Sequence, residues 1–172
     1  PLLFVRRCNA GAVNVRRAHQ EDAELVAALY DEATQWVDDL GYSQWPSPFP
    51  RNQLAAAIDR GEVYVVEAED GEPVATVALL LDDPTYWGNR PPDAFYVHKL
   101  AVRRDQAGRG IGAAVVEWAN AEAAEAGREF LRLDCLGDNP GIRDYYEDLG
   151  FEHRGDLVLD GRNMSLYERP VR

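Results

Sequence analysis

The spacing of hydrophobic positions changes along the chain between the period of a helix and that of a strand. Residues 18–40 place apolar side chains at helical intervals, at Leu25, Leu29, Trp36 and Leu40. This pattern predicts an amphipathic helix that ends at Gly41. After a loop dense in proline and aromatic residues, residues 51–61 predict a second, shorter helix that ends at Gly61.

Strands are predicted where apolar or alternating runs are bounded by turn residues. Such runs cover residues 13–17, 62–81, 93–102, 129–136 and 151–169. Two of them contain a turn dipeptide, Asp70-Gly71 or Asp160-Gly161, and are therefore expected to be hairpins. Helices are predicted between the later strands, at residues 113–126 and 139–149. The expected order is β-αα-βββ-α-β-α-ββ, an α/β (α+β) fold with a single mixed, mostly antiparallel sheet flanked by helices.

The composition fits one globular domain. The chain has 172 residues, of which 46% are hydrophobic and 28% charged, enough for a substantial core. We expect residues 1–12 to form an N-terminal arm and residues 13–172 to form the domain. The sequence shows neither a signal peptide nor a membrane-spanning run. The two distant cysteines, Cys8 and Cys135, favour a reducing compartment, so a cytoplasmic location is expected.

The charge balance argues against nucleic acid as a partner. Eighteen basic and thirty acidic residues give a formal net charge of -12, whereas proteins that bind phosphate backbones carry basic patches. A cationic or amine substrate would be attracted by this field. The alternative is that the acidic residues only keep the protein in solution.

Three alternating glycines, Gly108, Gly110 and Gly112, stand between a predicted strand and a predicted helix. Glycine lets the backbone approach a ligand closely, and the following helix directs free N–H groups at the same point, so a phosphate is the expected ligand. A nucleotide-triphosphate loop is excluded because its lysine is missing. A dinucleotide fingerprint and a simple turn remain as alternatives, although the five residues RRDQA separate the strand from Gly108.

Two motifs resemble signatures of the GNAT superfamily of N-acetyltransferases. The stretch QAGRGIGA resembles the Gln/Arg-x-x-Gly-x-Gly/Ala loop for acetyl-coenzyme A, with Gly110 and Gly112 at its small positions. The stretch NPGIRDYYEDLGF resembles the second signature, an Asn followed by a helix that ends in Tyr-Glu-x-x-Gly-Phe. The resemblance covers residues 13–167 and includes the order of elements. Ala107 stands where the family usually has Gln or Arg, so a side-chain contact to the pyrophosphate would have to come from Arg103, Arg104 or Arg109.

The resemblance implies which residues bind the cofactor and which one acts as the acid. Acetyl-coenzyme A would be held by the end of a strand, the glycine loop and the cap of the last helix: Leu100, Ala101, Val102, Ala107, Gly108, Arg109, Gly110, Ile111, Gly112, Ala113 and Asn139. Tyr146, the tyrosine before Glu-x-x-Gly-Phe, would be the general acid that protonates the leaving sulfur. No metal is expected.

His98 is the candidate general base. Histidine is the side chain whose ordinary pKa suits proton transfer at neutral pH, and arylalkylamine members of the superfamily are similar in carrying a histidine just before Leu-Ala-Val. Strand alternation predicts that His98 shares one face with Tyr96 and Leu100. The alternatives are that His98 only packs in the sheet and that ordered water serves as the base.

Aromatic residues are the candidates for binding the acceptor: Tyr96, Trp36, Trp45 and Trp87. Equally, Trp45 could pin its loop to the core or belong to a homodimer contact. The sequence therefore predicts an enzyme that moves an acetyl group from acetyl-coenzyme A to a primary amine of a small molecule by direct attack in a ternary complex, without nucleic acid or a membrane as partner. The alternatives are a non-catalytic acyl-CoA sensor and, less favoured, a dinucleotide-binding domain.

Overall fold

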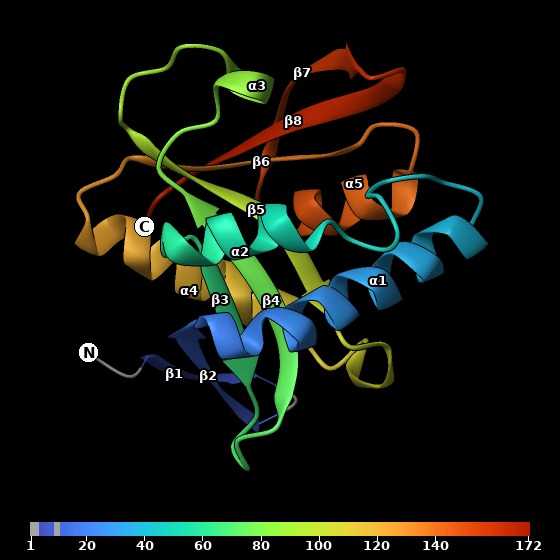
Figure 1. The fold of residues 1–172 in the computed structure, drawn as a ribbon. Coiled ribbons are helices and arrows are strands. Elements are labelled where there is room, and N and C mark those ends of the chain that lie inside the picture. The colour runs from blue at the N-terminus through green and yellow to red at the C-terminus, as the bar shows by residue number, and fades with distance from the viewer. Residues whose placement is uncertain (1–3, 9–10) are drawn as a thin grey trace. The chain divides into compact units, whose positions relative to one another are not determined.

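The computed structural model describes residues 4–8 and 11–172, and its strands form one mixed sheet with helices beside it (Figure 1). The strand order is β1-β2-β3-β4-β5-β6-β8-β7, which confirms the predicted fold class. The chain divides into two compact units, Pro1–Ala78 with Lys99–Trp118 and Leu79–His98 with Ala119–Arg172. The strands β4 (Pro73–Leu80) and β5 (Ala94–Val102) contribute residues to both units.

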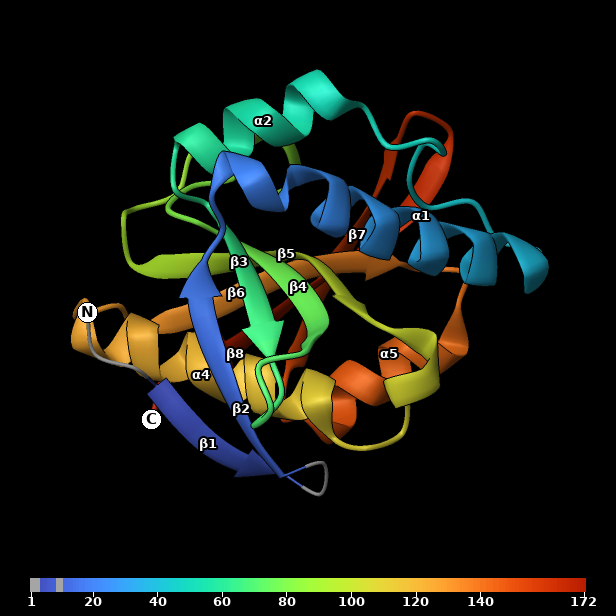
Figure 2. The same ribbon diagram turned by 60° about the horizontal axis from the view of Figure 1, so that its bottom comes forward.

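The first unit is an antiparallel series of strands packed against two helices. β1 (Phe4–Cys8), β2 (Gly11–Arg17), β3 (Val63–Glu67) and β4 pair in sequence order. The helices α1 (Ala23–Asp39) and α2 (Arg51–Asp59) lie side by side in both ribbon views (Figures 1 and 2). Residues of both helices share one core with β3, including Val26, Tyr30, Leu54 and Val65. Ala101 belongs to the same core, so this unit anchors the end of β5 from which the glycine loop starts.

The second unit is built on a parallel pair of strands extended by a hairpin. β5 runs parallel to β6 (Phe130–Leu136), with Val97 beside Leu133. β6 pairs with β8 (Arg162–Pro170), and β8 pairs with β7 (Glu152–Leu159), both antiparallel. The unit also contains α3 (Pro84–Trp87) and α5 (Pro140–Asp148). Parallel neighbours need a crossover, which α4 (Ile111–Glu125) provides between β5 and β6.

Most predicted elements are present, with ends shifted by a few residues. The Asp160-Gly161 turn joins β7 to β8 with φ of 50° and 74°, the left-handed pair that a tight hairpin requires. The helix α3 and the strand β1 were not predicted. α3 lies in a stretch expected to be a loop, and β1 lies within residues expected to be an arm; the boundary between arm and domain stays a prediction. Among the described helices, none combines the length and the apolar character needed to cross a membrane.

A residue with a left-handed backbone interrupts β5 after His98, where the sequence predicted regular alternation. Lys99 has a φ of 49°, in the left-handed region of the backbone. A residue in this conformation turns the strand out of its regular pleat, much as a bulge does. The spacing of Leu100 along the sequence is therefore not enough to place it on the same face as Tyr96 and His98.

Candidate active site

The glycine loop leads into α4 through two residues with a left-handed backbone. A 3-10 helix (Arg104–Gln106) follows β5, and Gly108 and Gly110 have φ of 75° and 82°. A Cβ at Gly108 would meet no atom of the described chain within 4 Å, so glycine is required there by conformation, and the space beside it is open. The N–H groups of residues 111–113 lie in the first turn of α4, where a helix leaves its donors to another acceptor.

The arginines around the glycine loop differ in the charge of their hydrogen-bond partners. Arg103 donates to Asp105 at 2.6 Å and to Glu72 at 2.7 Å, so its charge is matched by two carboxylates. Arg109 donates to the neutral side chain of Gln106, and both line a hollow of about 300 Å³ in the first unit. Because its described partner is uncharged, Arg109 is better placed than Arg103 to pair with an anionic ligand.

The aromatic residues of the first unit have two different surroundings. Trp36 is 41% exposed, and the guanidinium of Arg104 lies 3.8 Å from its ring centre. Trp45 packs against Tyr30 with ring centres 5.5 Å apart, and Phe49 is 5% exposed in the same core. These contacts favour the interpretation that Trp45 pins its loop to the core. The roles predicted for Trp36 and Trp45 in acceptor binding stay predictions.

His98 lies between two carboxylates in the second unit. Its Nε2 is 3.0 Å from Oδ2 of Asp83, and its Nδ1 is 3.5 Å from Oδ1 of Asp134. The three side chains are 11%, 6% and 10% exposed, in the order His98, Asp83, Asp134. Asp83 is also the N-cap of α3, where it accepts from the N–H of Tyr86. A histidine held by a carboxylate and shielded from water has the arrangement of a general base.

Tyr146 on α5 is electrostatically coupled to this cluster. Burial raises the pKa of Tyr146 well above its ordinary value, and Tyr145, Cys135 and Asp134 raise it further. The phenol therefore stays protonated at neutral pH and can act as a proton donor. Its neighbour Tyr145 is half-buried, and burial raises the pKa of that residue to about 12.

The segment that connects β6 to α5 has the features of a helix start. Asn139 is the N-cap of α5 and accepts from the N–H of Ile142 at 3.3 Å, and Pro140 follows at the first helical position. This confirms the predicted cap, while a bond from Asn139 to a cofactor stays a prediction.

Cys135 is 2% exposed, and burial, followed by the nearby Asp134, raises the pKa of its thiol to about 12.

Comparison with known proteins assigns the family. The sequence model described as the acetyltransferase (GNAT) family matches residues 26–151. The chain belongs to this family. A Bacillus subtilis protein named as an uncharacterized N-acetyltransferase, YesJ, is 31% identical over 160 residues, which cover 88% of the GNAT chain and 86% of that protein. The GNAT chain is therefore an acyltransferase.

Solved structures agree on the fold of this GNAT chain. A GNAT-family acetyltransferase from Listeria monocytogenes superposes with a TM-score of 0.81 at 23% identity, over 97% of this chain and 99% of that one. N-acetylglutamate synthase from Neisseria gonorrhoeae, complexed with coenzyme A and N-acetyl-glutamate, superposes with a TM-score of 0.68 at 20% identity. That match covers 93% of this chain and 35% of the synthase.

Sequence patterns did not reveal that Asp83 and Asp134 accompany His98 in this GNAT chain. The parallel register places Val97 beside Leu133, so the next residues along the two strands, His98 and Asp134, are neighbours. Hydrophobic patterns identify parallel strands but do not show how they are aligned. Asp83 is brought to His98 by the fold of the α3 segment, a stretch that the sequence predicts to be a loop.

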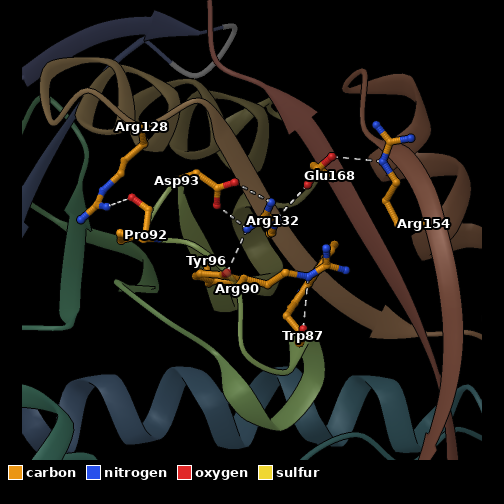
Figure 3. A network of polar contacts seen from close by, with 9 residues as sticks. All are labelled: Trp87, Arg90, Pro92, Asp93, Tyr96, Arg128, Arg132, Arg154 and Glu168. Atoms are coloured by element: carbon orange, nitrogen blue, oxygen red, sulfur yellow. Dashed lines mark hydrogen bonds and ion pairs between the residues drawn. The ribbon is translucent and has the colours of Figure 1, made fainter.

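A buried arginine holds the α3 segment of the GNAT chain to β6 and β8 (Figure 3). Arg132 donates to Asp93 at 2.8 Å, to Glu168 at 2.7 Å and to the Tyr96 hydroxyl at 3.0 Å. Burial alone lowers the pKa of Arg132, but these hydrogen bonds outweigh it and leave the pKa raised. Trp87 and Tyr96 pack around the guanidinium and are 6% and 2% exposed. The structure thus places both in the interior, and their predicted contact with the acceptor stays a prediction.

The described residues also contain a set with metal-ligand chemistry. One ligand atom each from Asp83, His98 and Asp134 lies within 4.8 Å of the other two. Carboxylates and imidazole bind divalent cations. However, the carboxylates face opposite nitrogens of the ring, whereas one ion would use a single ring nitrogen. The geometry therefore fits a histidine flanked by two carboxylates better than a metal site.

Proposed function

We propose that this GNAT enzyme transfers the acetyl group of acetyl-coenzyme A to a primary amine of a small molecule, by direct attack in a ternary complex. The observation that carries the proposal is the loop at the start of α4. Its left-handed glycines, Gly108 and Gly110, turn the backbone toward the first helical N–H groups. Consecutive main-chain donors with a helix behind them suit a pyrophosphate, which carries two negative charges.

The cofactor is supported by the family and by one neighbour. The Neisseria gonorrhoeae synthase was solved with coenzyme A, and its fold resembles this chain. In this chain the residues that would hold the cofactor are the loop residues Ala107 to Ala113, the strand end Leu100 to Val102, and Asn139. Arg109, whose described partner is a neutral amide, is better suited than Arg103 to replace the contact that Ala107 cannot make.

His98 takes the proton that an amine must lose before it can attack. Asp83 accepts a hydrogen bond at Nε2 and so leaves Nδ1 as the basic nitrogen. His98 lies two residues before Leu100 on β5, so the strand that would run beside the pantetheine arm also carries the base. Tyr146 then donates its proton to the leaving sulfur, because its raised pKa keeps the phenol protonated.

Direct attack is favoured over a covalent acetyl-enzyme. Cys135 is the cysteine of the second unit, and its thiol is buried with a pKa raised to about 12. A thiol with so high a pKa is a poor nucleophile at neutral pH. The acetyl group would therefore pass from sulfur to the amine nitrogen in one transfer.

The proposal is tested with a panel of alkylamines, arylalkylamines, polyamines and peptides, measured by the release of free coenzyme A thiol. We expect Tyr146→Phe to lower kcat by about 100-fold or more with little change in the affinity for acetyl-coenzyme A, because only the proton donor is lost. Tyr145→Phe on the same helix is the matched control and should keep kcat within about twofold. Binding of acetyl-coenzyme A without turnover on any amine would contradict the proposal, and activity on peptides alone would contradict the small-molecule acceptor.

A further inference from the structure

The two aromatic residues of α3 have different surroundings. Successive residues of a helix point about 100° apart. Trp87 turns into the interior, where it is 6% exposed and its ring centre lies 6.2 Å from that of Tyr96. Tyr86 is half-buried, and its ring centre lies 5.9 Å from that of His98. Tyr86 is therefore the α3 aromatic that borders the candidate base, although the sequence favoured its neighbour Trp87 for acceptor binding.

One buried carboxylate holds both Tyr86 and His98. Asp83 is 6% exposed, and its Oδ2 lies 3.0 Å from Nε2 of His98. Its Oδ1 accepts from the main-chain N–H of Tyr86 at 3.4 Å, and its carbonyl accepts from the N–H of Trp87 at 2.9 Å. Pro84 begins the helix at the position where proline is preferred. The spacing between the rings of Tyr86 and His98 is thus fixed before a ligand binds, which lowers the cost of ordering the site.

The charges near Tyr86 are mostly negative. Burial raises the pKa of Tyr86 to about 12, and Asp134 raises it next. Asp160 also raises it and Arg162 lowers it, and both lie at the turn between β7 and β8, beside α3 (Figure 1). The phenol therefore stays neutral at pH 7. Because Asp134 lies 3.5 Å from Nδ1 of His98, Tyr86 borders the side of the ring that carries the basic nitrogen.

An acceptor at His98 would meet the Tyr86 ring with its carbon atoms. An amine that gives a proton to His98 must lie within hydrogen-bond reach of that ring. The ring centre of Tyr86 is only 5.9 Å from the His98 ring centre, so the carbons attached to the amine start beside Tyr86. Tyrosine rings pack favourably against flat apolar groups, which cover the ring surface and exclude water from it. A short alkyl amine has too little surface to make this contact.

We propose that Tyr86 selects the acceptor by packing against a flat apolar group, such as an aromatic ring, that a short carbon chain joins to the amine. This inference rests on the proposed function and names the substrate class of the same site. The amine nitrogen lies at His98 and the apolar group lies on Tyr86, which makes Tyr86 a specificity-determining residue. The carboxylates around both rings attract the positive charge that such an amine carries in solution.

The first experiment observes binding without turnover. The chain has eight tyrosines, so NMR of protein labelled in its tyrosine rings gives few signals, and the Tyr86→Phe variant assigns that of Tyr86. 2-Phenylethylamine should shift the Tyr86 signal in a saturable way, because its ring lies against the tyrosine ring. Ethylamine, which carries the same charge but no ring, should shift it much less. No saturable shift with 2-phenylethylamine, or an equal shift with both amines, would overturn the inference.

Variants of α3 make the test specific. Tyr86→Leu keeps an apolar side chain beside Trp87 but removes the flat ring, and should weaken 2-phenylethylamine binding about tenfold or more in isothermal titration. Tyr86→Phe keeps the ring and should retain most of the binding, which separates the ring from its hydroxyl. Thr85→Ala changes the exposed neighbour on the same helix and should bind as the wild type does. Equal affinity in the wild type and Tyr86→Leu, or an equal loss in Thr85→Ala, would refute the role of Tyr86.

Acetyl transfer separates a selecting role from a structural one. The wild type should have a higher kcat/KM for 2-phenylethylamine than for ethylamine, mainly through a lower KM. Tyr86→Leu should lower kcat/KM at least about tenfold more for 2-phenylethylamine than for ethylamine. Equal losses for both amines would show that Tyr86 only supports His98, and would overturn the inference while the transferase proposal stands. If neither amine releases thiol in the wild type but the Tyr86 signal still responds to 2-phenylethylamine, the transferase proposal fails and the contact with Tyr86 stands.

Discussion

Arg109 is better suited to bind an anion than Arg103, the loop arginine that two carboxylates hold. Its described partner is the neutral Gln106, whereas Arg103 is paired with Asp105 and Glu72. We expect Arg109→Ala to weaken the binding of acetyl-coenzyme A about tenfold, because a charged hydrogen bond to phosphate is lost. The kcat at saturating cofactor should change little.

Isothermal titration with coenzyme A measures this effect directly. The matched control is Arg60→Ala, which removes an arginine at the exposed end of α2 in the same unit and should leave the affinity unchanged. Equal losses in both variants would point to a general effect of charge and would contradict a specific contact from Arg109.

At single residues, the sequence predicted the capping side chain of the last helix, because Asn139 caps α5 as expected. Gly108 and Gly110 have a left-handed φ, which glycine adopts readily but which their spacing did not predict. Lys99 has a left-handed φ without any such signal. A lysine has no preference for that region, so its conformation is imposed by the way the rest of β5 pairs and packs.

Among the elements, the α3 segment and strands β6 and β8 depend on Arg132. Arg132→Ala leaves Asp93 and Glu168 without their buried partner, and we expect it to lower the free energy of unfolding by about 3–5 kcal/mol. Arg154 pairs with the same Glu168 but is 41% exposed, so Arg154→Ala should cost only about 0–1 kcal/mol. Urea denaturation of the two variants measures the difference. Similar small losses in both would show that the buried network adds little to stability.

Long elements with a clear period were predicted well, and short elements were not. α1, α2 and the two hairpins follow from apolar spacing and from the dipeptides Asp70-Gly71 and Asp160-Gly161. α3 spans four residues, too few to show a period, although its cap Asp83 and Pro84 are typical of a helix start. β1 pairs with the next strand, β2, but the sequence between them lacks the Asp-Gly dipeptide that marked the other two hairpins.

For the whole molecule, ligand binding should appear as added stability. A ligand at 100 times its Kd stabilises the native state by about 2.7 kcal/mol. For a chain of this size that corresponds to a rise in Tm of about 5–10 °C. We expect acetyl-coenzyme A to produce this rise in a thermal-shift measurement, and NADH to produce none. A rise with NADH alone would favour the dinucleotide-binding alternative that the glycine spacing left open.

The sequence by itself determined the type and order of most elements, the glycine loop, the cap of α5 and the family resemblance. These features are local, because they depend on backbone preferences and on periods within a few residues. Only the tertiary structure decided that His98 lies between Asp83 and Asp134 and that Arg132 joins Asp93 to Glu168. Those groups come from distant segments, and their approach is set by the alignment of parallel strands and by packing of the α3 segment, neither of which leaves a period in the sequence.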